Sequence, residues 1–139
     1  MRYDGGHCLK HLDEHAFALI QSWQGQGLLL PLCPEVAGGL PVPRPGAEIL
    51  GERVITQAGV DVTSAFAVGA NKALDLCRLH RIQYAILKQG SPSCGNTLVN
   101  DGSFQKVKVQ GSGITASFLK QHGIQVFNET ELKALAVLL

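Results

Sequence analysis

Residues 84–95 begin with the apolar run Tyr84-Ala85-Ile86-Leu87 and end with the loop Ser91-Pro92-Ser93-Cys94-Gly95. The apolar run favours a strand, and the glycines and the proline that follow favour a tight, stiff loop. In an open α/β sheet, the loops at the carboxyl ends of the strands carry the chemistry. We therefore expect the Cys94 thiol and the neighbouring hydroxyls to be presented at such a sheet edge.

A second stretch has the same organisation. The apolar run Leu28–Leu32 leads directly into Cys33-Pro34-Glu35. A short run that is apolar on both faces is typical of a strand in a parallel sheet. Two predicted strands thus end in a cysteine beside a proline and a potential acid, base or nucleophile, and we expect the two loops to meet.

Helical and strand patterns alternate along the rest of the chain. This alternation predicts one domain over residues 1–139, with a three-layer, Rossmann-like α/β fold, a mainly parallel sheet and helices on both of its faces. The expected helices lie at about 8–24, 61–80 and 114–120 and after 131; the expected strands lie at 28–32, 48–50, 53–56, 84–87 and 124–127, with an irregular hairpin over 98–109.

The composition excludes several classes of protein. Hydrophobic residues make up 45% of the chain and charged residues 17%, and the net charge is +1. This balance is typical of a globular domain and argues against a basic patch that binds nucleic acid. The longest apolar runs are too short to span a membrane. Four cysteines without a signal peptide indicate a reducing, cytoplasmic setting.

The four cysteines have different contexts. Cys77 lies on the apolar stripe of a predicted helix and is expected in the core. Cys8 lies near a helix start, where an inert thiol is the simpler interpretation. Cys33 and Cys94 each follow a predicted strand, and their spacing alone leaves metal binding, catalysis and a plain structural role open. A structural zinc site is disfavoured, because the chain has no close Cys-x-x-Cys pair.

Other polar residues near the two cysteines also have two interpretations each. Glu35 is either a general base or a solvated loop carboxylate. Ser91 and Ser93 either act in a site or bond their own loop backbone. Arg44 either binds an anion or pairs with Glu48. The residues alone do not choose between these interpretations.

Several motifs, taken together, resemble the thiouracil desulfurase family, and they follow the family's order over essentially the whole chain. These motifs are Arg2-Tyr3-Asp4-Gly5-Gly6, the run from Cys33-Pro34-Glu35 through Pro45, Ala85–Lys88 with Ser91–Gly95, Asp101-Gly102, and Gly111-Ser112-Gly113-Ile114-Thr115-Ala116.

The resemblance implies an iron–sulfur enzyme whose [4Fe–4S] cluster is held by three cysteines, with one iron open to the sulfur of a thiolated pyrimidine. It places Cys33 and Cys94 as cluster ligands, Glu35 as the proton-transfer group and Ser91 as an active-site hydroxyl. Arg44 and Ser93 are then expected to contact the substrate. The implied reaction converts C=S to C=O on thiouracil or a related small thioamide, without a net redox change.

The sequence departs from the family at its start. Family members begin with a strand that ends in Cys-Leu-Leu-Gly and supplies the third ligand, whereas Met1 here directly precedes Arg2. We therefore expect a cluster that is absent or incomplete, and a sheet edge open to self-association. Cys8 is the one other thiol near the motif. One alternative is a non-catalytic family member that binds a cluster or a small molecule. A thiol hydrolase using Cys94 is less favoured, because no histidine lies in a loop beside either cysteine.

Overall fold

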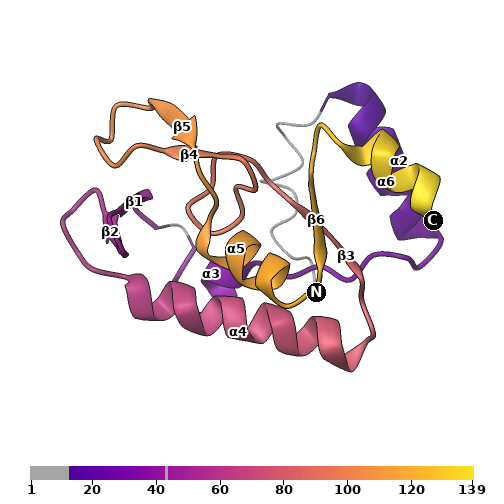
Figure 1. Cartoon of the computed structure of the whole chain (residues 1–139), viewed down its shortest axis with the longest axis horizontal. Helices are drawn as coiled ribbons and strands as arrows, with labels where there is room; N and C mark the ends of the chain where they lie inside the picture. Colours follow the sequence, from indigo (N-terminus) through magenta and orange to yellow (C-terminus); the bar gives the residue numbers. More distant parts are fainter. Residues whose placement is uncertain (1–12, 43) are drawn as a thin grey trace.

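The computed structural model describes residues 13–42 and 44–139. Figure 1 shows a mixed α/β arrangement, with the long helix α4 along one side of the molecule and the remaining elements above it. In chain order the described elements are α2 (Glu14–Gly25), α3 (Pro34–Ala37), β1 (Ala47–Leu50), β2 (Arg53–Thr56), α4 (Thr63–Leu79), β3 (Tyr84–Leu87), β4 (Leu98–Asn100), β5 (Lys108–Gln110), α5 (Ile114–Gln121), β6 (Gln125–Asn128) and α6 (Leu132–Leu138).

Strands β3 and β6 form a parallel pair at the centre of the domain. Tyr84 and Ile86 pack with the core residues of α2 and α6. Ala85 and Leu87 pack on the other face, with the core residues of α4 and α5. This alternation follows from the strand period of two, which sends successive side chains to opposite faces. Helices therefore cover both faces of the parallel pair, as the sequence predicts.

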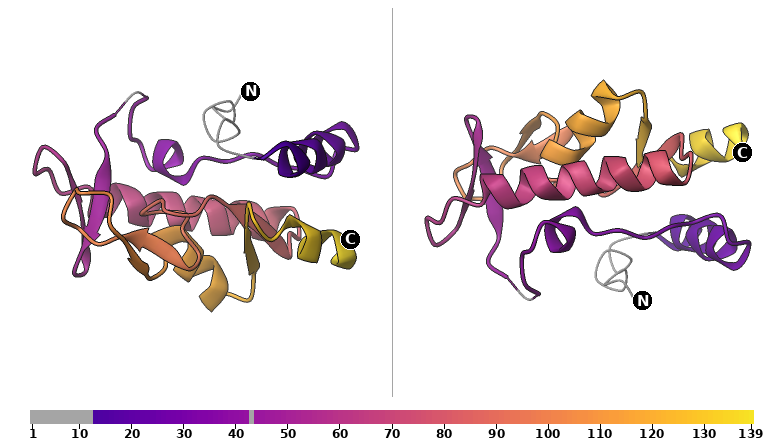
Figure 2. Two further views of the ribbon diagram at one scale, coloured as in Figure 1. Left: turned by 90° about the horizontal axis from the view of Figure 1, so that it is seen from above. Right: turned by 90° about the horizontal axis from the view of Figure 1, so that it is seen from below.

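The mainly parallel sheet is not confirmed. Within the described ranges the strands form three two-stranded sheets: β1–β2 and β4–β5 are antiparallel, and β3–β6 is parallel. Residues 28–32 are extended but form no strand ladder, which corrects the strand predicted there. The apolar pattern of this segment specifies two buried faces, but a strand also needs a hydrogen-bonded neighbour, and here the segment lines a cavity that β3 lines as well. Figure 2 shows the segment from α2 to α3 running apart from the rest of the chain.

The helix starts differ in detail from the predictions. Helix α2 begins after Asp13, whose Oδ1 accepts a hydrogen bond from the amide of Ala16 at 2.7 Å. The earlier part of this predicted helix lies outside the described residues. At α4 the N-cap position belongs to Val62, and Asp61 Oδ1 accepts from the amide of Thr63. The short helix α3 was not expected, although a proline in the first turn suits a helix start.

The last helix follows a local exchange of hydrogen bonds between Asn128, Thr130 and Glu131. Glu131 Oε1 accepts from the Asn128 amide at 3.0 Å, and Asn128 Oδ1 accepts from the Thr130 amide at 2.8 Å. These bonds satisfy amides at the turn between β6 and α6. The helix itself then begins at Leu132.

Glu48 joins the two hairpins. Its carboxylate is buried, and Oε1 accepts from the amides of Gly102 at 3.0 Å and Phe104 at 3.1 Å. The sequence left Glu48 open as a partner of Arg44, and the structure corrects this alternative. A buried carboxylate needs such donors, because leaving it without partners would be costly.

Candidate functional site

The Cys33 segment rests on helix α4 through a contact that only glycine permits. A Cβ at Gly69 would lie 1.9 Å from the carbonyl oxygen of Pro34, which is well inside van der Waals contact. Cys33 directly precedes α3, and its carbonyl oxygen accepts from the Ala37 amide at 2.9 Å. Because Gly69 has no side chain, the segment that carries Cys33 packs directly against the backbone of α4.

The loop after β3 is organised by the hydroxyl of Ser91. Its Oγ accepts from the amides of Ser93 and Cys94, at 3.1 Å each, and its carbonyl oxygen accepts from the Gly95 amide. An oxygen that accepts two amide protons keeps its own proton free to donate. Ser91 also lines the large cavity of the domain, so this donor is available to a molecule bound there.

Ser93 holds the same loop against helix α5. Its hydroxyl is buried and bonds the Thr115 hydroxyl at 2.7 Å, while its carbonyl oxygen accepts from the amides of Thr115 and Ala116. A Cβ at Gly113 would lie 2.4 Å from the Ser93 carbonyl group, so the loop packs directly on the start of α5. Ser93 therefore supports the loop, and its predicted contact with substrate stays a prediction.

Gln89 fixes the far side of the loop, although the sequence analysis did not select it. Its side-chain Oε1 accepts from three successive amides, those of Asn96 at 3.1 Å and of Thr97 and Leu98 at 3.2 Å. The Gln89 amide donates to Glu129 Oε2 at 2.9 Å. No local pattern signals this role, because the bonds join residues that meet only after the loop has closed.

Asn96 ties the loop to strand β6 from within the core. Its Nδ2 donates to Glu131 Oε1 at 3.0 Å and to the Val126 carbonyl at 3.3 Å, and its Oδ1 accepts from Asn128 Nδ2 at 3.0 Å. Asn96 and Asn128 are both buried. Buried amides in a satisfied network specify one loop position, because every alternative leaves a polar group unpaired.

Arg44 contacts both the carboxylate and the thiol of the other segment. Its Nε donates to Glu35 Oε2 at 3.1 Å, and its Nη2 donates to the same oxygen and lies 3.9 Å from Cys33 Sγ. Nη1 donates to the Pro41 carbonyl at 3.1 Å. Burial alone would lower the pKa of Arg44, but the hydrogen bond and charge of Glu35, together with Cys33, raise it on balance. The guanidinium is therefore a fixed cation of this site.

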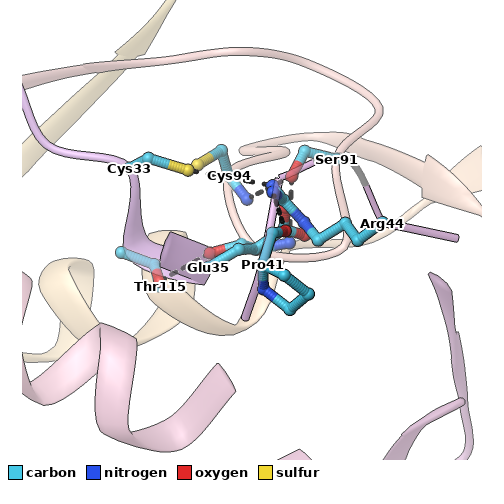
Figure 3. A network of polar contacts seen from close by, with 8 residues as sticks. Cys33, Glu35, Pro41, Arg44, Ser91, Cys94 and Thr115 are labelled. Atoms are coloured by element: carbon cyan, nitrogen blue, oxygen red, sulfur yellow. Dashed lines mark hydrogen bonds and ion pairs between the residues drawn. The ribbon is translucent and has the colours of Figure 1, made fainter. Parts of the chain in front are cut away.

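Cys33 and Cys94 come together, as predicted from the two loops. Figure 3 shows their sulfur atoms facing one another beside Glu35, Arg44 and Ser91. Burial raises the pKa of the Cys94 thiol to about 12; the hydrogen bond with Ser93 opposes this shift, and the negative charges of Glu35 and Cys33 add to it. A thiol in this environment stays neutral unless a cation arrives to balance its charge. Cys77 is buried in the core, as expected.

A cavity of about 1630 Å³ opens next to these groups. Its walls are mostly apolar and come from residues 28–32, from β3 and from the inner faces of α4 and α6. The polar groups on its surface include Cys33, Glu35, Arg44, Ser91 and Cys94. Mostly apolar walls with a few convergent polar groups are the usual composition of a small-molecule site.

The donor set suits a thiophilic metal group. Two cysteine thiols face one another, and thiolates are the usual ligands of iron–sulfur clusters. Among residues 13–42 and 44–139, however, no three His, Cys, Asp or Glu side chains gather as a metal site. The described residues therefore fit two ligands of a cluster. Cys8 lies outside the described residues.

Comparison with known proteins gives the family. The family model described as 2-thiouracil desulfurase matches residues 1–131. The chain belongs to the 2-thiouracil desulfurase family. A family relative from Bacillus subtilis (strain 168), the uncharacterized protein YbbK, is 36% identical over 141 residues, which cover 94% of this chain and 89% of the relative.

A solved structure extends the comparison. The structure of the [4Fe–4S]-dependent thiouracil desulfidase TudS is similar to this chain with a TM-score of 0.84 and 49% sequence identity, over 86% of this chain and 79% of the other. The fold is thus shared with a protein that is described as [4Fe–4S]-dependent. None of the helices in the described ranges combines the length and apolarity needed to cross a membrane.

Proposed function

We propose that this protein is a [4Fe–4S]-dependent desulfurase that replaces the sulfur of a small thiolated pyrimidine, such as 2-thiouracil, with oxygen. The observation that carries the proposal is the meeting of the Cys33 and Cys94 thiols with Glu35 and Ser91 at one apolar cavity. Family membership and the likeness to the thiouracil desulfidase support it. The balanced reaction is C=S plus water giving C=O plus hydrogen sulfide, so no oxidant or reductant is needed.

Cys33 and Cys94 are the residues that would hold the cluster. When bound, a cluster with one open iron supplies a soft Lewis acid for the sulfur atom of the substrate. The charge of such a group also suits this environment. The neutral Cys94 thiol would lose its proton to water when a metal cation binds its sulfur, and the ionised sulfurs would lie close to Arg44.

Glu35 and Ser91 have complementary roles in the proposed reaction. Glu35 is a carboxylate at the cavity, beside Cys33 and Cys94, and would take a proton from the attacking water. Ser91 accepts two amide protons and can donate its own, which suits a group that binds an oxygen or nitrogen atom of the substrate ring. The apolar walls would exclude bulk water, which strengthens both interactions. Substrate contacts from Ser93 remain part of the proposal.

The cavity also supports the prediction of a mainly parallel sheet. Native cores keep few voids larger than a water molecule, yet this cavity of about 1630 Å³ lies between the extended residues 28–32 and β3. β3 pairs with β6 along one edge, and the structure gives no strand partner to its other edge among the described residues. We propose that a further strand occupies this space and completes a three-layer fold. An apolar strand-forming segment fused before Met1 should raise the melting temperature and, if it ends in cysteine, the bound iron per chain.

The same space supports the proposed mode of self-association. If a second copy supplies the strand, the protein forms dimers whose melting temperature rises with protein concentration. Light scattering of the chain with and without the fused segment separates this possibility from a strand supplied by the same chain. We place the protein in the cytoplasm, because Cys33, Cys77 and Cys94 are all free thiols, which suits a reducing compartment.

A non-catalytic member of the family is the second candidate. It is favoured by one observation, the presence of two rather than three cysteine ligands among the described residues. Such a protein would bind a thiolated pyrimidine, or a cluster, without releasing sulfide. It would give a binding signal in calorimetry and no product.

The experiment is anaerobic reconstitution with iron and sulfide, followed by incubation with 2-thiouracil. Desulfuration predicts uracil and sulfide in equal amounts, with turnover lost when iron is removed by a chelator. Binding without product would favour the non-catalytic candidate. Turnover that persists in fully chelated protein would overturn the iron dependence.

A further inference from the structure

Arg44 was expected to contact the substrate, but each of its three nitrogen atoms already donates to a protein group. Nε and Nη2 donate to Glu35 Oε2, and Nη1 donates to the carbonyl oxygen of Pro41. Nη2 also lies 3.9 Å from Cys33 Sγ. A guanidinium whose three nitrogen atoms all donate to protein groups has few N–H groups left to bind the ring of a substrate.

The contacts are directed to one oxygen of the carboxylate. Both hydrogen bonds that Arg44 donates to Glu35 end on Oε2, and no described residue donates to Oε1. The pair is also largely shielded, with side chains 22% and 17% exposed for Arg44 and Glu35. An exposed carboxylate would rotate among several positions. Two hydrogen bonds from Arg44 to one oxygen instead hold the carboxylate of Glu35 in one orientation.

We propose that Arg44 is a positioning residue: it fixes Glu35 by Oε2, beside Cys33, and leaves Oε1 as the oxygen that takes the proton from water. This inference rests on the proposed desulfuration and replaces substrate binding as the role of Arg44. The fork of the guanidinium matters, because a lysine has one point charge and cannot hold the carboxylate, the Pro41 carbonyl and the position beside Cys33 together.

The first readout is the division of the kinetic effect between kcat and KM in the reconstituted protein. Arg44→Lys and Arg44→Gln should lower kcat about 10²-fold, the scale expected for misplacing a catalytic group by about 1 Å, and change KM by less than about threefold. Methylguanidinium added to Arg44→Gly should recover part of kcat. A rise in KM with kcat unchanged would show that Arg44 binds substrate and would overturn the proposal.

The second readout needs no cluster and no activity. In the cluster-free chain, Arg44→Gln should lower the melting temperature by about 3 °C, and the same change in a Glu35→Gln background should lower it by much less. Arg53→Gln is the matched control, since Arg53 and Asp61 form an exposed pair at 3.8 Å and should show no coupling to Glu35. Additive effects of Arg44→Gln and Glu35→Gln would overturn the proposal.

The kinetic and the melting-temperature measurements test the desulfurase function and the positioning role of Arg44 separately. If the parent protein releases no sulfide from 2-thiouracil, the desulfurase function is overturned, and the melting-temperature cycle alone decides whether Arg44 positions Glu35. If the parent is active but Arg44→Lys keeps the parent kcat, the positioning role is overturned and the function stands.

Discussion

The Ser91–Gly95 loop and the segment from Cys33 to Arg44 each bring one cysteine to the same cavity, but they are supported differently. The first is held by loop amides that donate to the half-buried Gln89 side chain and by buried hydrogen bonds of Asn96 and of the Ser93–Thr115 pair. The second lies against α4 through close contacts at two glycines, Gly38 and Gly69, and is closed by the Arg44–Glu35 pair. The loop is therefore part of the stability of the domain, whereas the segment carries groups placed for chemistry. Changes to the side chains that hold the loop should act mainly on folding, whereas changes to the carboxylate of Glu35 in the segment should act mainly on turnover.

The largest expected effect is on turnover, at the less supported segment. Glu35→Gln keeps the shape of the side chain and removes its proton chemistry, so kcat should fall about 10²–10⁴-fold with the iron content unchanged. Steady-state assays and iron analysis on the same reconstituted sample measure both. Parental turnover by this variant would show that Glu35 is structural and would remove the distinction between the two regions.

The contact of the Cys33 segment with α4 is tested by Gly69→Ala. Its new Cβ would lie 1.9 Å from the Pro34 oxygen, so the free energy of unfolding should fall by about 3 kcal/mol, although alanine favours helix. Denaturant titration of the cluster-free chain gives the value.

Gly25→Ala is the control for this change, because a Cβ there meets no atom within 4 Å. Gly25→Ala should leave the free energy of unfolding unchanged or raise it slightly. Equal stability of the two variants would mean that Pro34 does not lie against α4 as described.

The buried network of the other loop is tested by Asn96→Ala. The change removes the partners of Asn128 and Val126 and one donor to Glu131, so we expect a loss of about 2 kcal/mol in unfolding free energy. Asn71→Ala, at an exposed position on α4, should change it by less than about 0.5 kcal/mol. If both variants unfold at the same denaturant concentration, the network does not stabilise the loop.

The smallest expected effect is at the hydroxyl pair behind Cys94. Ser93→Ala leaves the Thr115 hydroxyl buried without its partner and should cost about 1 kcal/mol. Removing both hydroxyls, in Ser93→Ala with Thr115→Val, should cost less than the sum of the single changes. Thermal unfolding of the four proteins of this cycle gives the coupling. A large rise in KM for Ser93→Ala, with stability unchanged, would instead assign Ser93 to substrate binding.

Local patterns predicted most of the helices and strands, but they could not predict the sheet. The Tyr84–Leu87 strand, the long helix α4 and the first hairpin follow from periodicity and turn residues close in sequence. Residues 28–32 have the same apolar pattern as a buried strand, yet a strand also needs a neighbour, and β3 lies across a cavity from them. The failed prediction therefore concerns pairing, which a local pattern does not contain.

Some residues of the candidate site could likewise be predicted from local patterns, and others could not. Cys33 and Cys94 could be selected as candidates because each follows an apolar run in a loop framed by proline and glycine, whereas the roles of Glu35 and Ser91 came from the family resemblance. Gln89, Asn96 and Gly69 could not, because their roles depend on partners between 7 and 40 residues away, or on the close approach of α3 to α4. The role of Arg44 likewise required the geometry of its donors.

Diffraction at the iron absorption edge from crystals of the anaerobically reconstituted protein tests most directly whether the two regions form one site. The account predicts a compact group of anomalous peaks bonded to both Cys33 Sγ and Cys94 Sγ, at the cavity beside Glu35 and Ser91. Iron bound elsewhere, or no iron in crystals of protein that still desulfurates 2-thiouracil, would contradict it.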